Sequence, residues 1–271
     1  MHGDNHKTSQ GDYDMGFAIV RHAFSMVFGN FGQALRLSVG PVLIAAVLIY
    51  AVAAALRIGM VSIMFMFMNP ANVDPAIPLF LIFAFIVVTF TSAWIAVSWH
   101  RFILKEEYTG LLPQLRDRPV GRYIIKTLGI TLWVILVAAL AGFVLGFILA
   151  VTGSENSFIA GMIGGVLVGA LVSYVWFRLA LVLPSIAIDR PMTLGESRAA
   201  TKPISGTIWQ VVFILAFLSF IAQTVVGAIV PGSPAVQLTL NAVLTWFTTM
   251  IGLSVLTTFY GHLIEGRDLA T

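Results

Sequence analysis

The sequence predicts an all-α polytopic membrane protein with six transmembrane helices, arranged as three pseudo-repeated hairpins with amphipathic cytoplasmic interfacial helices. The first observation is composition: 59% of the residues are hydrophobic and 10% are charged, whereas about a quarter of an ordinary soluble domain is charged. The second is length, because ~20 apolar residues are needed to cross ~30 Å of hydrocarbon. Six stretches are long enough, at roughly 39–67, 79–103, 127–151, 158–183, 208–230 and 236–262.

The third observation is that the second stretch of each pair ends in an aromatic residue followed by a polar or basic one. The three endings are Trp99–Arg101, Trp176–Arg178 and Phe259–His262. A glycine that precedes each pair recurs at a similar interval, about 80 to 90 residues. Chance similarity is the alternative, since Trp favours membrane interfaces in any helix. We interpret the regularity as three copies of one unit, at about 15–104, 105–188 and 189–265.

Basic residues fall on one side of the predicted spans. The short connections within the three hairpins hold no Lys or Arg, and of the 15 such residues only Arg57 lies near them. Short loops that carry Lys and Arg stay in the cytoplasm. We therefore expect both termini in the cytoplasm, and an even number of spans agrees. The first apolar stretch starts near residue 39, too late for a secretory signal peptide, so the chain is expected to stay whole in the membrane.

The N-terminal region changes character at about residue 15. Residues 1–14 are polar and expected to be disordered, and residues 15–271 are expected to form a single six-span membrane domain. From residue 15 to residue 37 apolar side chains recur at three- and four-residue steps, which predicts an amphipathic interfacial helix with a break at Gly29-Asn30. The apolar positions are Phe17, Val20, Phe24, Val27, Phe28, Phe31 and Leu35.

Small residues in the third and fourth spans recur in four-residue steps. They are Gly142 and Gly146, then Gly161, Gly165 and Gly169. Small residues at this spacing let two membrane helices approach closely. We therefore expect these glycines to pack spans three and four together, and a seam between two copies of the chain is the alternative.

Two arginines, Arg101 and Arg178, end long apolar stretches. An arginine deep in hydrocarbon is unfavourable without a partner. Counting ~20 residues from the start of each span places both near the inner boundary, where the side chain can reach the headgroups. Beside their Trp neighbours they are candidates for binding anionic lipid phosphates. The full set of candidate lipid- or partner-binding residues is Trp99, Arg101, Trp176, Arg178, Arg118, Arg122 and Lys202.

Several reaction classes are disfavoured by missing residues. The chain has no cysteine, which excludes disulfides, thiolate metal sites and cysteine nucleophiles. It contains no GxxxxGK[ST], HExxH or GxSxG sequence, and no acidic residue lies within a predicted span, which argues against a proton relay. We predict no catalytic residue, cofactor, metal or nucleic-acid partner. A membrane-embedded enzyme would need a cluster drawn from His100, His262, Glu106 and Asp189.

Polar residues within the spans define the main alternative function, a small transporter or channel component. Such a protein would need a polar cavity between the hairpins, lined by residues such as Ser98, Ser173, Gln223 and Asn241. The scarcity of charged residues within the spans argues against it. Gln223 and Asn241 are otherwise expected to form a hydrogen bond between spans five and six.

The segment 174–201 carries the most specific motif. Arg178, Leu181, Pro184 and Asp189 follow the pattern R-x-x-L-x-x-P-x-x-x-x-D, and a segment with the pattern S-x-x-x-T comes next. This motif resembles that of the YciC-like bacterial inner-membrane proteins, and the membrane domain attached to some glycerophosphodiester phosphodiesterases is similar. The resemblance implies a helical module of the bacterial inner membrane without an established reaction, because the phosphodiesterase's catalytic domain is missing here.

These observations favour a non-enzymatic, multi-pass protein of the bacterial inner membrane with a structural, accessory or lipid- and partner-binding role. Its expected partners are anionic lipids of the cytoplasmic leaflet, and also another membrane protein complex or a second copy of the chain. Each Lys or Arg near an anionic membrane surface contributes about 1 kcal/mol to such contact.

Overall fold

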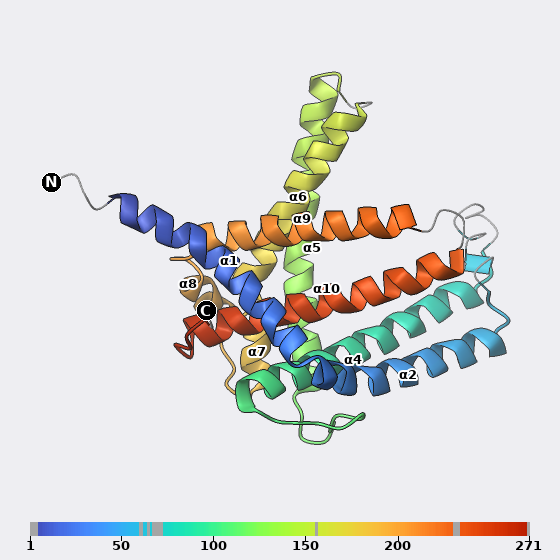
Figure 1. Cartoon of the computed structure of the whole chain (residues 1–271). Helices are drawn as coiled ribbons and strands as arrows, with labels where there is room; N and C mark the ends of the chain where they lie inside the picture. Colours follow the sequence, from blue (N-terminus) through green and yellow to red (C-terminus); the bar gives the residue numbers. More distant parts are fainter. Residues whose placement is uncertain are drawn as a thin grey trace.

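The structure is a computed structural model that describes residues 5–59, 62–63, 66, 73–154, 157–229 and 234–269. Within those residues it contains helices and no strand (Figure 1). Parts of the short connections within the three hairpins, at 67–72, 155–156 and 230–233, lie outside the described residues. The main helices are α1 (Asn5–Gly29), α2 (Phe31–Ala55), α4 (Ala76–Lys105), α5 (Val120–Val151), α6 (Phe158–Leu179), α7 (Val182–Ala187), α8 (Leu194–Ala200), α9 (Ser205–Ile229) and α10 (Pro234–Leu263).

Six segments of the described chain are long and apolar enough to cross a membrane, which confirms the predicted number of spans. The protein is therefore a multi-pass membrane protein. Each predicted hairpin forms, because α2 packs on α4, α5 packs on α6, and α9 contacts α10. The spans are Phe31–Ala55, Ala76–Lys105, Val120–Val151, Phe158–Ala187, Ser205–Ile229 and Val236–Leu263.

The first span differs from its predicted range of 39–67. It begins at Phe31, directly after the break at Gly29-Asn30, which is confirmed. It ends at Ala55, because Arg57 adopts the left-handed region with φ 56° and the Ile58 N–H bonds back to the Ala53 carbonyl. This is a common way to end a helix. Because the sequence stays apolar after Arg57, hydropathy alone does not predict that the helix ends there.

Helix α1 lies along α9 and α10. It starts at Asn5, and the disorder expected for residues 1–14 stays a prediction. Its fully buried stripe is Ile19, Ala23 and Val27, whereas Phe17 is 68% exposed. The helix thus buries its small and β-branched residues against the spans and leaves a bulky aromatic ring outside.

The three predicted units share their hairpins but differ in the segments before them. The first hairpin, α2–α4, is preceded by α1, and the third hairpin, α9–α10, is preceded by the short helices α7 and α8. Residues 106–119, which precede the second, form a loop without a helix. This loop folds back on the bundle, where the Gln33 and Trp94 side chains donate hydrogen bonds to its carbonyl groups. The threefold repeat of whole units therefore stays a prediction.

The α5–α6 hairpin projects away from the other spans. In Figure 1 it rises toward the top, while α2, α4, α9 and α10 run toward the right. Within the most apolar 18-residue segment of α5, and likewise of α9, only 6% of the residues are buried by other parts of the protein. Such large exposed apolar faces are typical of surfaces that contact lipid or another membrane protein.

The predicted glycines do not pack α5 against α6. A methyl group added at Gly142, Gly146, Gly161, Gly165 or Gly169 would have no heavy atom within 4 Å. The close approach between α5 and α6 instead occurs at Gly164, which lies outside the predicted pattern. A Cβ added at Gly164 would meet the Leu145 side chain of α5.

A second close approach predicts a strong effect of Gly40→Ala. A Cβ at Gly40 would overlap the backbone carbonyl of Leu111, an atom that cannot rotate away. We expect the substitution to destabilise the protein by about 1–3 kcal/mol, measured as a lower midpoint of thermal unfolding in detergent. Gly146→Ala is the matched control, because its methyl group meets open space and alanine favours helix by ~1 kcal/mol. Equal shifts for the two variants would contradict the packing of the loop on α2.

Candidate functional site

The two arginines at the ends of apolar spans have different surroundings. Arg101 lies near the end of α4 and Arg178 near the end of α6. Arg101 is 7% exposed and forms ion pairs with carboxylates. Arg178 is half-buried, and its hydrogen-bond partners are neutral oxygen atoms. The two arginines have equivalent positions in the sequence pattern, but their partners in the structure differ: Arg101 pairs with carboxylates, and Arg178 with neutral oxygen atoms.

Glu107 and Asp189 hold the Arg101 guanidinium from two sides. Nε and Nη2 donate to the two carboxylate oxygens of Glu107 at 3.0 and 2.7 Å, and Nη1 donates to Asp189 Oδ2 at 2.6 Å. Nη1 also donates to the Ala187 carbonyl at 2.8 Å. Two-pronged pairing between arginine and carboxylate is strong and fixes the orientation of both groups. Arg101 therefore ties the end of α4 to its own loop and to the turn after α7.

Tight helix ends bring these carboxylates to Arg101. Helix α4 ends at Lys105, and Glu106 caps it in the left-handed region with φ 56°, which turns the chain back toward the bundle. Asp189 follows α7 and its cap and has a φ of 63°. Aspartate adopts this region more readily than most residues. Each carboxylate thus comes from a segment that reverses direction just before it.

Three further basic residues surround the two carboxylates. Arg118 Nη1 lies 2.7 Å from Glu107, and Lys105 and Arg122 lie 3.5 and 3.9 Å from Asp189. The predicted lipid-contact arginines in this part of the chain are thus paired within the protein, and lipid contact through them stays a prediction. We call the whole set the Arg101 cluster: Arg101, Lys105, Glu107, Arg118, Arg122 and Asp189.

The cluster lowers the pKa of both carboxyl groups. For Glu107 the main cause is the hydrogen bonding to Arg101, which outweighs burial, and the charges of Arg101, Arg118 and Lys105 lower the pKa further. For Asp189 burial raises the pKa, but the hydrogen bond and charge of Arg101, together with Lys105, outweigh it and lower the pKa. A carboxyl group with a depressed pKa in the folded state stabilises the fold when ionised, and that contribution is lost as the pH falls.

We expect the protein to lose thermal stability as the pH falls below the ordinary Glu and Asp values of about 4.3 and 3.9. The unfolded chain binds these protons at a higher pH than the folded protein does, so acid favours unfolding. The check is to compare the unfolding midpoints of the unmodified protein and Glu107→Gln from neutral to acidic pH. The variant should be less stable at neutral pH and less sensitive to acid. The same pH dependence in both would contradict the ion pairing.

Neutral oxygen atoms surround the Arg178 guanidinium. Nη1 donates to the Tyr174 and Ser205 hydroxyls at 2.9 and 3.3 Å, Nε donates to Thr201 Oγ1 at 3.1 Å, and Nη2 donates to the Arg198 carbonyl at 2.9 Å. Its Cζ lies 5.7 Å from the centre of the Tyr174 ring. No carboxylate in the described part of the chain forms an ion pair with it. The protein orients this charge without neutralising it.

The S-x-x-x-T segment explains how Arg178 is oriented. Helix α8 starts with a capping box, in which Thr193 and Glu196 each accept a hydrogen bond from the other's backbone N–H. Ser197 then donates to the Arg178 carbonyl at 2.9 Å, and Thr201 accepts from the Arg178 side chain. Residues four apart lie on one helix face. The motif therefore fixes α8 against the end of α6.

Arg178 lies in a groove of about 490 Å³ between α5, α6 and α8, which we call the Arg178 groove. Arg198, which is exposed, is the second charged residue in its lining. Trp133 on α5 is 58% exposed and contributes to an apolar wall. The lining is Trp133, Val137, Tyr174, Val175, Arg178, Leu179, Leu194, Gly195 and Arg198.

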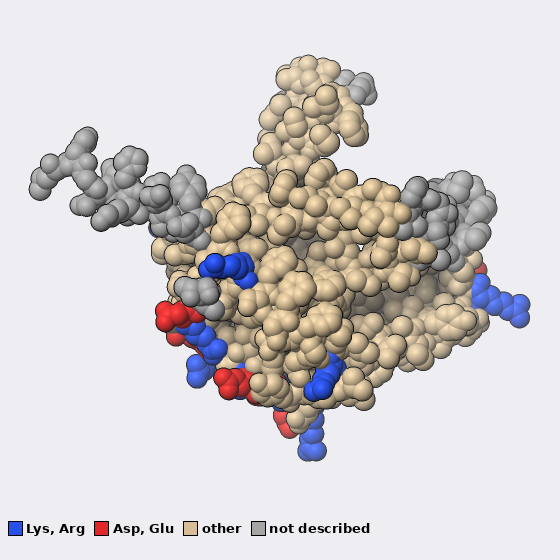
Figure 2. All heavy atoms as spheres, viewed as in Figure 1, with Lys and Arg blue, Asp and Glu red and all other residues tan. Residues whose placement is uncertain are grey.

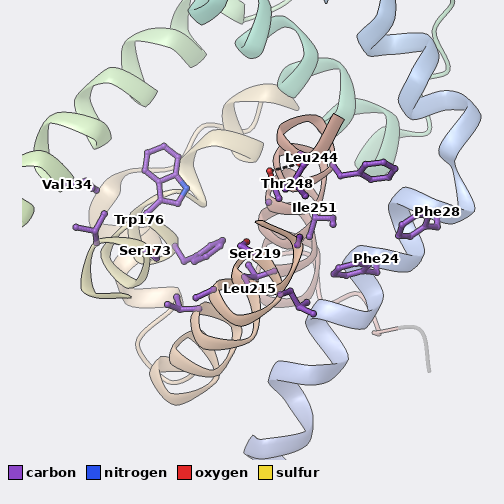
Figure 3. A pocket seen from close by; sticks show the side chains of 18 residues that line it. Phe24, Phe28, Val134, Ser173, Trp176, Leu215, Ser219, Leu244, Thr248 and Ile251 are labelled. Carbon is purple, nitrogen blue, oxygen red and sulfur yellow. Dashed lines mark hydrogen bonds between the residues drawn. The ribbon is translucent and has the colours of Figure 1, made fainter. Parts of the chain in front are cut away.

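A larger cleft of about 680 Å³ lies between α1, α5, α6, α9 and α10. Figure 3 shows Phe24 and Phe28 of α1 on one side and Trp176 and Ser173 of α6 on the other. None of its lining residues is charged. The Ser173 and Thr248 hydroxyls donate to carbonyl groups of their own helices. The lining of the cleft is therefore mainly apolar, and the transporter alternative stays a prediction.

The other residues proposed for a transporter cavity lie elsewhere. Ser98 is buried and donates to the Trp94 carbonyl at 2.8 Å. Gln223 is exposed on α9 and Asn241 is half-buried on α10. Within the described residues neither amide side chain forms a hydrogen bond, so the expected bond between spans five and six is wrong.

His100 joins three helices as a buried, hydrogen-bonded residue. Its Nδ1 lies 2.8 Å from Thr257 Oγ1 on α10, and its Nε2 lies 3.2 Å from the Tyr123 hydroxyl on α5. Thr257 donates its only proton to the Leu253 carbonyl, so Nδ1 is the donor and Nε2 the acceptor. In the described ranges no three His, Asp or Glu side chains are grouped to hold a metal.

The remaining predicted residues are distributed between core and surface. Trp99 is 0% exposed and its Nε1 donates to Ser254 Oγ at 3.0 Å, so it is a core residue and not a lipid- or partner-binding one. Trp176 is half-buried and lines the apolar cleft (Figure 3). Lys202 is exposed just after α8. Their shared position at span ends therefore did not imply a shared role.

Three residues of the Arg178 groove were not predicted from the sequence: Trp133, Tyr174 and Arg198. A signal existed for Tyr174, which precedes Arg178 by four residues and so lies on the same face of α6. Another existed for Arg198, which stands inside the S-x-x-x-T segment. Trp133 comes from a different hairpin, and nothing local in the sequence connects it to Arg178.

Comparison of the chain with protein-family models, curated proteins and solved structures found no match. The proposed function therefore rests on the geometry of the span ends.

Proposed function

We propose that this protein is a non-catalytic protein of the bacterial inner membrane with a structural or accessory role in membrane organisation. It acts through contact of its basic end, which we place in the cytoplasm, with anionic lipid. The bacterial location rests on the resemblance of the motif at 174–201 to YciC-like proteins. The observation that carries the proposal is the segregation of charge at one end of a six-span bundle.

Figure 2 supports this segregation directly. Charged side chains gather around the end where α1, α8 and the C-terminus lie, and the projecting part of the α5–α6 hairpin, residues 127–154 and 157–177, has none. Arg57, which follows the far end of α2, is the exception among the basic residues. Lys and Arg on short loops favour the cytoplasmic side, where the leaflet surface is negative.

Not all of this positive charge is neutralised within the protein. Arg36, Lys126 and Lys202 are exposed and form no ion pair in the described part of the chain. Each such residue near an anionic surface contributes about 1 kcal/mol of attraction. Salt weakens that attraction because the Debye length falls to about 3 Å at 1 M. Lipid contact through these residues is therefore expected to depend on lipid charge and on salt.

The test uses the full chain in lipid nanodiscs. The midpoint of thermal unfolding should be higher in discs that contain phosphatidylglycerol than in discs of phosphatidylcholine with the same acyl chains, and high salt should reduce the difference. Changing Arg36, Lys126 and Lys202 together to Gln should also reduce it, with little effect in phosphatidylcholine. Equal midpoints in the two lipids for the unmodified protein would overturn the proposal.

A further inference from the structure

We infer that the Arg178 groove is a binding site for the phosphate-bearing headgroup of an anionic membrane lipid. The inference rests on the proposed contact with anionic lipid and adds a defined site to it. Two arginines supply the positive charge, and an apolar wall lies next to them. The charges come from α6 and α8, and the wall comes from α5 and α8.

The charge of Arg178 is available to a ligand. Its four hydrogen-bond acceptors are hydroxyl and carbonyl oxygens, which carry no net charge. Arg101, the corresponding residue of the preceding hairpin, has two carboxylates against its guanidinium instead. The acidic residue of α8, Glu196, accepts a hydrogen bond from the Thr193 N–H and forms no ion pair in the described part of the chain. The groove therefore keeps a positive charge that the Arg101 cluster does not.

Arg178 is also held in position before a ligand arrives. The ring of Tyr174 and the hydroxyls of Thr201 and Ser205 restrain its guanidinium. Of its five N–H groups, one on Nη2 is free of these bonds, because Nη2 donates only to the Arg198 carbonyl. A guanidinium that is already oriented loses little side-chain entropy when it binds phosphate.

Arg198 completes the anion site. Its backbone carbonyl accepts from Arg178 Nη2, and its side chain also lines the groove. The side chain is exposed, with no ion pair in the described residues. A phosphate between the two residues can accept one hydrogen bond from the free Nη2 N–H of Arg178 and a two-pronged pair from Arg198, because the fork of donors of an unpaired guanidinium matches the oxygen spacing of phosphate.

The wall of the groove distinguishes a lipid from a free phosphate ion. Trp133 and Val137 of α5 face the groove together with Leu194 of α8. Tryptophan is enriched where headgroups meet hydrocarbon, and Arg178 stands near the end of α6, where the chain turns into the short helix α7. Inorganic phosphate gains nothing from an apolar wall, whereas the glycerol and upper acyl chain of a lipid lie against one. The shared chemistry is the phosphate, and the geometry favours the lipid.

Binding is measured by native mass spectrometry of the full chain with short-chain phosphatidylglycerol, with phosphatidylcholine of the same chain length, and with inorganic phosphate. We expect Arg178→Gln and Arg198→Gln each to weaken phosphatidylglycerol binding by at least about tenfold, the loss of one charge-assisted contact of roughly 1.4 kcal/mol. Arg116→Gln is the control, because Arg116 is a surface arginine whose side chain is 90% exposed. It should bind as the unmodified protein does.

Each outcome decides one point. If Arg178→Gln unfolds, Arg198→Gln still tests the site, since that side chain is exposed. Preference for phosphatidylglycerol that neither variant weakens would overturn the site and leave the proposed function standing. No preference in the unmodified protein would overturn both. Phosphate binding as strong as lipid binding, and lost in the same variants, would overturn the lipid as the ligand.

Discussion

Replacing Arg101 with alanine is expected to lower the free energy of unfolding by about 3 kcal/mol, the upper end of the range for hydrogen bonds to charged groups, because its buried guanidinium donates four of them. The substitution leaves Glu107 and Asp189 without the guanidinium that satisfies them. It also disconnects α4 from the turn after α7. The midpoint of thermal unfolding in detergent measures the effect.

Two further variants make this expectation specific. Arg101→Lys should recover little of the loss, because an ammonium group cannot reproduce the two-pronged contact with Glu107. Arg118→Ala, which removes a single contact to the same carboxylate from a more exposed position, should cost about 1 kcal/mol or less. Similar losses for Arg101→Ala and Arg118→Ala would contradict the central place of Arg101 in the cluster.

Replacing Trp99 with alanine is expected to have an effect of similar size, about 3–5 kcal/mol. Trp99 is fully buried where α4 meets α10, and the change leaves a cavity there. It also removes the indole N–H that donates to the Ser254 hydroxyl, which keeps its own bond to the Met250 carbonyl. A lower unfolding midpoint in detergent is the expected observation.

Matched controls separate volume from hydrogen bonding. Trp99→Phe keeps most of the ring and loses the N–H, so it should cost less than the alanine variant. Trp133→Ala removes a tryptophan that is 58% exposed and should change stability by about 0.5 kcal/mol or less. If Trp99→Ala were as mild as Trp133→Ala, Trp99 would not be a core residue.

The number of spans could be predicted from the sequence because apolar length is a local property. The end of the first span could not, because the apolar residues continue past Arg57 while the backbone turns there. The glycine contact was missed for a related reason. The spacing of Gly161, Gly165 and Gly169 marks one face of α6, but the neighbouring face, with Gly164, is the one that meets α5. Which face meets a neighbour depends on how the two helices cross.

In the candidate site, too, local features could be predicted from the sequence and contacts between distant segments could not. Arg101 and Arg178 both follow a Trp at the end of an apolar run, so the local sequence gives them one role. Asp189 reaches Arg101 from 88 residues away, and no local pattern reveals that pairing. The S-x-x-x-T segment did carry information, because Ser197 and Thr201 both bond to Arg178. The S-x-x-x-T segment thus indicates Arg178, the arginine whose charge is not neutralised by a carboxylate of the protein.

The difference between the two arginines leads to one decisive measurement. The unfolding midpoints of the unmodified protein, Arg101→Gln and Arg178→Gln are compared in nanodiscs of phosphatidylcholine and of phosphatidylglycerol. Arg101→Gln should lower the midpoint by the same amount in both lipids, since its partners are carboxylates of the protein. Arg178→Gln should lower the midpoint in both lipids, because it loses four hydrogen bonds within the protein, and it should lower the midpoint more in phosphatidylglycerol. An equal loss in both lipids for Arg178→Gln would contradict the account, because Arg178 would then serve the fold alone.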